Sequence, residues 1–302
     1  MVKSWCSGGS VALSLVMLAA CDSDFRPYNE IHGFRVLAIT AEPPELVRDG
    51  RVQLRVLAVG DPGATFSWSW CPVTLGPSSS HACAFADDEI PEGLPRAFLG
   101  TSTTTEIAWT GSDAAHDMLC DESALRAAPS GAPRYDCSSP RPQIFIRLEA
   151  TSSTGERIVA LKELPLRSID ASANQIPHAM GLGWKDGEGY RPLDEGSVLT
   201  SGAEISLEID ISENESETWL DGSTVQEEIL RATWFVEGGE TDIERTVFIP
   251  GDDTATFDAL RTNTWTLPTG VDRAVLYLVV RDDRGGTSWI SRTVELDEGE
   301  VP

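Results

Sequence analysis

The sequence predicts an all-β fold of two β-sandwich modules in tandem, and three observations support that prediction. Apolar and polar residues alternate along short runs that end at Pro, Gly and Asp, as expected of half-buried strands. No stretch shows a strong helical stripe, and only residues 117–127 and 225–230 are candidates for short helices. One strand plan occurs twice, and the roughly 280 residues that follow the leader suit two modest domains.

The first twenty residues are typical of a secretory signal. Lys3 is their only charged residue, and residues 11–18 form an apolar run that is too short to span a bilayer. Residues 18–21, Leu-Ala-Ala-Cys, resemble the lipobox of bacterial lipoproteins, in which the cysteine receives diacylglycerol and becomes the new N-terminus. The competing interpretation is an ordinary signal peptide that is cleaved near residue 20.

The lipobox resemblance implies a location. Cys21 would carry lipid, palmitate included, and would anchor the protein to a membrane of the cell envelope with its folded part outside the cytoplasm. The sequence leaves the choice between the inner and outer membranes open. Residues 21–33 are polar and rich in turn residues, so we expect a lipidated tether there.

The first module is expected over residues 34–167. Its strand candidates share alternating apolar residues, and they lie at 34–39, 52–59, 66–70, 144–150 and 157–161. Trp68 and Trp70 share one face of their strand, so they form either a core pair or an aromatic platform for sugars.

An insertion near 71–142 contains Cys71, Cys83, Cys120 and Cys137. An even number of cysteines in an exported chain predicts two disulfides with three compatible connectivities, and proximity favours Cys71–Cys83 and Cys120–Cys137. The spacing disfavours the competing zinc site, because no Cys-x-x-Cys pair occurs. Long ordered loops often carry binding residues, so this insertion is a candidate partner surface.

A linker is expected at 168–177, where alternation stops, and a second module at 178–302. The strand candidates of the second module repeat the earlier plan, and they lie at 204–209, 232–236, 274–280 and 289–296. Both modules place a tryptophan one strand after an alternating strand, and both end in a hairpin. That order is typical of a sandwich with a core tryptophan in its third strand.

The end of the second module carries a resemblance. Residues 279–287, Val-Val-Arg-Asp-Asp-Arg-Gly-Gly-Thr, follow a strand that contains Trp234. Together they resemble the last hairpin of bacterial immunoglobulin-like and PKD-like domains. The resemblance implies an immunoglobulin-like sandwich for the second module. The first module has a similar layout but lacks this motif, and its long disulfide-bearing insertion departs from the family pattern. The prediction is therefore two immunoglobulin-like β-sandwich modules in tandem, the first with that insertion. The resemblance also implies a spacer, adhesion or carbohydrate-associated role.

The net charge and the absence of known catalytic motifs disfavour several classes of function. The formal net charge of −25 disfavours nucleic-acid binding, which needs a basic face. No His-Glu-x-x-His, Gly-x-Ser-x-Gly or phosphate-binding glycine pattern occurs, so we expect neither enzyme activity nor a cofactor. Asp282 and Asp283 suit a hairpin turn, with Ca²⁺ ligation as the weaker interpretation. The acidic run 213–217 is interpreted as a solvated loop.

The leading hypothesis is a non-catalytic, membrane-anchored envelope lipoprotein. Its immunoglobulin-like modules would bind or scaffold another envelope or surface component, which is a protein or a glycan. The alternative is a polysaccharide-binding or polysaccharide-processing accessory protein. An enzyme with scattered catalytic carboxylates ranks third, because carboxylates are abundant but no pair stands out.

Overall fold

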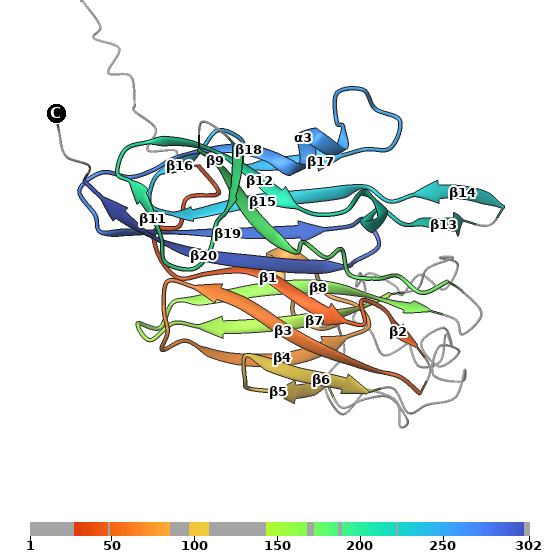
Figure 1. The fold of residues 1–302 in the computed structure, drawn as a ribbon. Helices are drawn as coiled ribbons and strands as arrows, with labels where there is room; N and C mark the ends of the chain where they lie inside the picture. Colours follow the sequence, from red (N-terminus) through yellow and green to blue (C-terminus); the bar gives the residue numbers. More distant parts are fainter. Residues whose placement is uncertain are drawn as a thin grey trace, which may run out of the picture.

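Figure 1 shows the protein as a computed structural model. The structure describes residues 27–47, 49–84, 97–108, 143–167, 172–186, 189–221 and 223–298. Nearly all of its regular structure is strand, which confirms the predicted all-β class, and its described α-helix is the short α3 (Phe257–Arg261). The helix expected at 225–230 is wrong, because those residues belong to strands and their connection. The other helix candidate, 117–127, lies outside the described residues.

The first sandwich consists of a three-stranded sheet, β1-β3-β6, and a five-stranded sheet, β2-β8-β7-β4-β5. Its strands are β1 (Arg35–Glu42), β2 (Leu46–Val47), β3 (Arg51–Val59), β4 (Thr65–Cys71), β5 (Phe98–Gly100), β6 (Thr104–Ala108), β7 (Gln143–Thr151) and β8 (Arg157–Arg167). The two sheets enclose a core that includes Trp68, Trp70, Leu54 and Ile146. The alternation of buried and exposed residues along β3 shows directly why this segment is a strand with one buried face.

The second sandwich consists of two five-stranded sheets, β10-β9-β12-β18-β16 and β11-β20-β19-β15-β17. Its strands are β9 (Gly181–Asp186), β10 (Gly189–Pro192), β11 (Ser197–Thr200), β12 (Glu204–Asp210), β15 (Leu230–Glu237), β16 (Glu240–Thr241), β17 (Arg245–Phe248), β18 (Thr262–Thr266), β19 (Arg273–Arg281) and β20 (Thr287–Asp297). Trp234 and Trp265 are fully buried in its core. A separate hairpin, β13 (Thr218–Asp221) and β14 (Thr224–Glu227), extends between β12 and β15.

Both sandwiches follow one topology. In each, a short early strand runs parallel to the last strand, β2 beside β8 and β11 beside β20. In each, the last two strands form an antiparallel hairpin that pairs with the tryptophan-bearing strand, β4 or β15. This is the strand order of immunoglobulin-like sandwiches.

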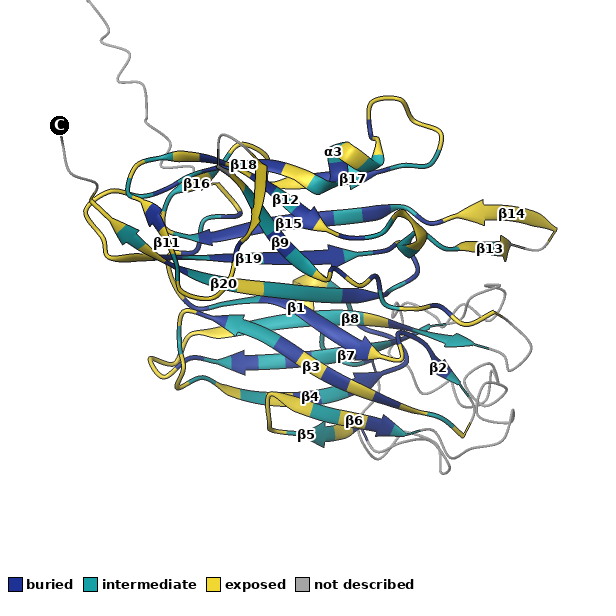
Figure 2. Cartoon of the chain, in the orientation of Figure 1, coloured by how far each residue is buried: buried dark blue, intermediate teal, exposed yellow. Residues whose placement is uncertain are grey.

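The two sandwiches pack against each other, as Figure 1 shows. A third apolar cluster lies between them and joins residues of β1 and the end of β3 to residues of β15 and β19; it includes Leu37, Val59, Phe235 and Val279. These residues are buried on strand faces that point away from the two main cores, and Figure 2 shows exposed residues gathered mainly at turns and outer edges. Burial of this cluster favours a fixed orientation of the two sandwiches.

The described part of the predicted tether, residues 27–33, lies against the second sandwich. The Ile31 N–H donates to the Val236 carbonyl at 2.8 Å, and the Val236 N–H donates to the Asn29 carbonyl at 3.0 Å. Tyr28 packs on Phe235 with ring centroids 5.7 Å apart. The chain therefore contacts β15 of the second sandwich before it enters the first. Within the described ranges, no helix is long and apolar enough to cross a membrane.

Candidate functional site

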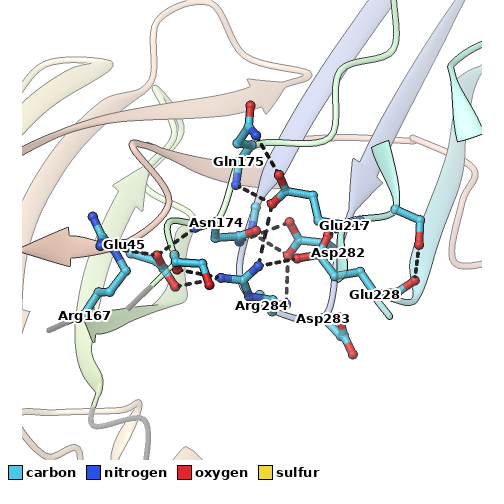
Figure 3. Close-up of polar contacts among 12 residues, drawn as sticks. Glu45, Arg167, Asn174, Gln175, Glu217, Glu228, Asp282, Asp283 and Arg284 are labelled. Carbon is cyan, nitrogen blue, oxygen red and sulfur yellow. Dashed lines mark hydrogen bonds and ion pairs between the residues drawn. The ribbon is translucent and has the colours of Figure 1, made fainter. Parts of the chain in front are cut away.

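The most concentrated group of buried charges lies where the two sandwiches meet, around the turn between β19 and β20. We call this group the junction, and Figure 3 shows most of it. Its members share burial or half-burial and contacts that cross between elements; they are Glu45, Lys162, Arg167, Asn174, Glu217, Glu228, Asp282 and Arg284.

Asp282 holds the turn itself. Its Oδ1 accepts hydrogen bonds from the backbone N–H of Arg284 at 2.8 Å and of Gly286 at 2.7 Å. Its Oδ2 accepts from Asn174 Nδ2 at 3.2 Å. A Cβ on Gly286 would lie 2.9 Å from the Gln175 carbonyl oxygen, so only glycine fits there. The Asp and Gly residues at this position are thus explained by backbone geometry.

Arg284 is the central cation of the junction. Its side chain is 4% exposed, and it forms ion pairs with Glu228 at 3.0 Å, Glu217 at 3.6 Å and Glu45 at 3.5 Å. The guanidinium also lies over the Trp219 ring, 5.6 Å from its centroid. Arginine suits this position because its planar group offers several donors at fixed angles and keeps its charge when buried.

Two bridges join the junction to the first sandwich. Glu45, between β1 and β2, binds the Asn174 N–H at 2.9 Å and pairs with Arg167 of β8 at 3.2 Å. Lys162 of β8 donates to the Gly285 carbonyl and to Thr287 Oγ1 of the second sandwich. The first sandwich thus supplies both a carboxylate and an ammonium group to the turn of the second.

Burial shifts the pKa values of Glu228, Asp282 and Lys162 toward neutrality. Desolvation, followed by the nearby Asp282 carboxylate, raises the pKa of Glu228 to about 7, although Arg284 and the Glu217 N–H oppose the shift. Burial also raises the pKa of Asp282 and lowers the pKa of Lys162 to about 8. The unfavourable burial of charge is therefore the largest effect at each of these groups, and pairing compensates it only in part.

The arrangement is suited to fixing an orientation. Most contacts described above run from a charged side chain to backbone or to an opposite charge, and several link the two sandwiches. Among the residues that the structure describes, no group of three or more His, Cys, Asp or Glu is placed to hold a metal ion. Asp283 Oδ1 accepts from the Ile229 N–H at 3.3 Å, so this carboxylate also serves the local backbone.

The structure brings together one pair of the predicted cysteines. Cys71, at the end of β4, forms a disulfide with Cys83, and their Cα atoms are 5.6 Å apart. Proximity in sequence favours that pairing. Cys120, Cys137 and the proposed lipidation site Cys21 lie outside the described residues.

The tryptophans of the β4 strand form a core pair. Trp68 is 0% exposed and Trp70 is 1% exposed. The Trp68 indole N–H donates to the Ser102 carbonyl at 2.6 Å, which satisfies its polar atom inside the sandwich. The aromatic platform interpretation is therefore wrong for this pair.

Most junction partners of Arg284 were not predictable from sequence. Glu217 belongs to the acidic run 213–217, which the sequence predicted to be a solvated loop. In the structure it pairs with Arg284 and accepts hydrogen bonds from the backbone N–H and the side-chain amide of Gln175. Glu45 and Glu228 stand in no motif at all. The one feature of the sequence that points to this site is the Asp-Asp-Arg-Gly-Gly turn. An arginine between acidic residues and glycines suggests a hydrogen-bonded turn, but it does not indicate which distant residues pair with the arginine.

No protein-family model matches the chain, and no curated protein matches it. Solved structures with a similar arrangement include murine CEACAM1b, which is 9% identical, covers 86% of this chain and 100% of its own, and has a TM-score of 0.23. The N-terminal Ig1-2 module of the Drosophila receptor protein tyrosine phosphatase DLAR is 10% identical, with 88% and 100% covered and a TM-score of 0.25. The Bacteroides ovatus glucan-utilisation protein SGBP-B, solved with a mixed-linkage heptasaccharide, is 10% identical, with 88% and 48% covered and a TM-score of 0.22. At these scores the likeness supports no inference about function.

Proposed function

We propose that this chain is a non-catalytic, lipid-anchored protein of the cell envelope. Its two sandwiches act as one rigid body that binds or scaffolds another envelope or surface component. The observation that carries the proposal is the junction, in which Arg284 joins Glu45 of the first sandwich to Glu217 and Glu228 of the second. A rigid pair of sandwiches keeps surfaces on different modules at a fixed separation, which is what a scaffold needs.

The contacts between the sandwiches oppose their relative motion. Tandem domains usually move relative to each other unless a large apolar interface joins them. Here an apolar cluster and a network of buried ion pairs both join the two sandwiches. Opening the junction would expose the apolar cluster to water, which is unfavourable. The ion pairs make the closed orientation specific, because Glu45 of the first sandwich meets Arg284 of the second only in this arrangement.

The position of the N-terminal segment supports anchorage near the second sandwich. Residues 29–31 are hydrogen-bonded to Val236 of β15. Six peptide units separate Cys21 from Pro27, and they reach about 20 Å at most. Lipid on Cys21 would therefore hold this edge of the second sandwich close to the membrane.

The anchor is tested by the intact mass of membrane-extracted protein, before and after reduction and alkylation. We expect a chain that begins at Cys21 with added diacylglycerol, with or without a third acyl chain. We also expect four cysteines that react only after reduction. A chain without lipid that begins elsewhere would contradict the anchor, and cysteines that react without reduction would contradict the disulfides.

The binding role is tested by cross-linking in intact membranes, with a glycan array in parallel. We expect specific protein partners in the envelope, and no hydrolysis of polysaccharide or protein substrates. Recovery of glycans alone would favour the alternative of a polysaccharide accessory protein. Turnover of any substrate would contradict the non-catalytic assignment.

A further inference from the structure

The β13–β14 hairpin projects from the second sandwich and exposes an apolar pair. Figure 1 shows it extending past the end of the sandwich. Leu220 and Val225 stand directly opposite each other, so their side chains share one face, and they are 64% and 67% exposed. Exposed apolar side chains that lie side by side on a projecting hairpin are candidates for contact with a partner.

The base of the hairpin is fixed by the junction. Glu217 and Glu228, the residues that flank it, both pair with Arg284, and the Glu228 N–H donates to the Glu217 carbonyl at 2.9 Å. Trp219, whose side chain points to the opposite face from Leu220, lies over Arg284. The hairpin is therefore held in place before any partner arrives, which reduces the entropy lost on binding.

The hairpin also presents backbone groups at its edges. In the described part of the chain, β13 and β14 pair only with each other. The bond from Glu228 to Glu217 marks a hydrogen-bonded pair, and such pairs alternate along an antiparallel ladder. Leu220 and Val225 are therefore a non-hydrogen-bonded pair whose N–H and C=O groups point outward. Outward groups on an unpaired edge are the template for strand addition.

The charge of the hairpin and its neighbouring residues indicates which kind of partner would bind there. Residues 210–228 contain seven acidic residues and no Lys or Arg. Arg284 pairs with both Glu217 and Glu228, but its single positive charge offsets only one of these seven acidic residues, so the segment keeps a net negative charge. A second copy of this chain, at a net charge of −25, would be repelled, whereas a basic segment would be attracted.

We propose that the β13–β14 hairpin is the docking edge for an extended segment of another protein in which apolar residues alternate with Lys or Arg. The segment adds as a strand, its backbone pairs with the outward groups of Leu220 or Val225, and its apolar residues cover their side chains. Its basic residues are attracted by the net negative charge of residues 210–228. This inference rests on the proposed binding role and deepens it by naming the chemistry of the partner.

The test measures binding of the detergent-solubilised full chain to a fluorescent nonapeptide that alternates lysine and valine. A peptide that alternates glutamate and valine is the control for charge. We expect saturable binding of the lysine peptide alone, and slower amide hydrogen exchange at Leu220 or Val225 in the complex. The double variant L220S/V225S keeps the charges and should weaken binding about tenfold or more.

Two further variants separate strand addition from general attraction. Val225→Pro removes one outward N–H and leaves the bonds within the hairpin intact, so it should weaken binding at the β14 edge. Val198→Ser replaces a valine of similar exposure, 61%, on the edge strand β11 and should change nothing. Equal binding by L220S/V225S and the parent chain, or equal loss in Val198→Ser, would overturn the assignment.

A second copy as the occupant would also overturn it, and would be recognised by self-association in light scattering that L220S/V225S abolishes. Failure here is distinguishable from failure of the proposed function. If the peptide does not bind while cross-linked partners contact another surface, the hairpin assignment is wrong and the binding role stands. If neither experiment finds a partner, the binding role itself is wrong.

Discussion

The two sandwiches close with the same turn in opposite environments. Between β7 and β8, the Ser152 N–H donates to the Glu156 carbonyl at 2.8 Å, and Ser152 Oγ accepts from the Glu156 N–H at 2.9 Å. Between β19 and β20, the Asp282 N–H donates to the Gly286 carbonyl at 3.2 Å, and Asp282 Oδ1 accepts from the Gly286 N–H at 2.7 Å. The fourth residue of each turn is a glycine with positive φ.

The difference lies in what surrounds the two turns. The first is exposed at its tip, where Asp61 accepts bonds from Ser153, and those bonds lower the pKa of Asp61. The second is buried in the junction, where desolvation raises the pKa of Asp282. One turn architecture thus serves either as a surface connection or as a connector between sandwiches. The deciding features are Asp in place of Ser at the first position and Arg284 at the third.

The largest expected effect comes from removing that arginine. Arg284→Ala would leave Glu45, Glu217 and Glu228 facing one another without their shared cation. It should lower the free energy of unfolding by about 3–5 kcal/mol. Urea unfolding at neutral pH measures this. The matched control is Arg51→Ala, which breaks an exposed ion pair with Glu106 and should cost less than about 1 kcal/mol. Equal losses in the two variants would show that the junction does not depend on Arg284.

The second effect is a pH dependence from Glu228. The folded protein keeps this carboxyl protonated up to a pKa of about 7, whereas its ordinary value is 4.5. Its stabilising contribution is therefore fully present below pH 4.5 and is lost as pH rises to 7, by about 3 kcal/mol. Glu228→Gln should remove this slope. A slope that persists unchanged in the variant would assign it to other groups, Asp282 first among them.

The exposed turn should show the opposite sign. The pKa of Asp61 is lowered, so its contribution is present above the unfolded value and is lost as pH falls through the folded value. Asp61→Asn should therefore reduce the loss of stability in acid, whereas Glu228→Gln should act between pH 4.5 and 7. Unfolding curves across pH 2–8 for the two variants separate these windows, and overlapping windows would contradict the contrast between the turns.

A smaller effect tests whether the two turns share one architecture. Asp282→Ala would leave the buried N–H groups of Arg284 and Gly286 without an acceptor and should cost about 2 kcal/mol. Asp282→Ser, which copies Ser152 of the first turn, should restore roughly half of that loss because its hydroxyl can accept one of the two bonds. Thermal unfolding compares the variants. If serine is no better than alanine, hydrogen bonding within the turn is not the main role of Asp282.

The smallest effect concerns the two glycines at the fourth position. Gly155 has φ 90° and Gly285 has φ 106°, and a Cβ on either would meet no close contact. Alanine at each position should therefore cost about 1 kcal/mol through backbone strain alone. Clearly unequal losses in the two single variants would show that burial, and not backbone conformation, governs this position.

The strands were predictable because each is specified by its own residues. Alternation in β3 and β7 follows directly from one buried face, and the turn between β19 and β20 was recognisable from its Asp and Gly residues. The junction was not predictable in this way. Glu45, Glu217 and Arg284 are far apart in the sequence. Glu217 reaches Arg284 through the fold of the second sandwich, and Glu45 reaches it only because the two sandwiches pack together. No local pattern therefore distinguishes these two glutamates from the many other acids of this chain.

Tertiary packing also decides two features that the local sequence pattern leaves open or indicates wrongly. Residues 225–230 have a helix-like spacing of apolar residues, but Val225 pairs across a hairpin and Leu230 begins a core strand, so tertiary pairing overrides the local pattern. Trp68 and Trp70 share a face, and the spacing alone does not say whether that face is inside or outside. The facing sheet β1-β3-β6 decides it by covering both rings.

Scanning calorimetry of the parent protein and of Arg284→Ala tests most directly whether the junction makes the two sandwiches one rigid body. We predict a single cooperative transition for the parent, and for the variant either two transitions or one that is much broader, because the sandwiches then unfold separately. Two separate transitions in the parent, with only the second shifted by the variant, would contradict the account.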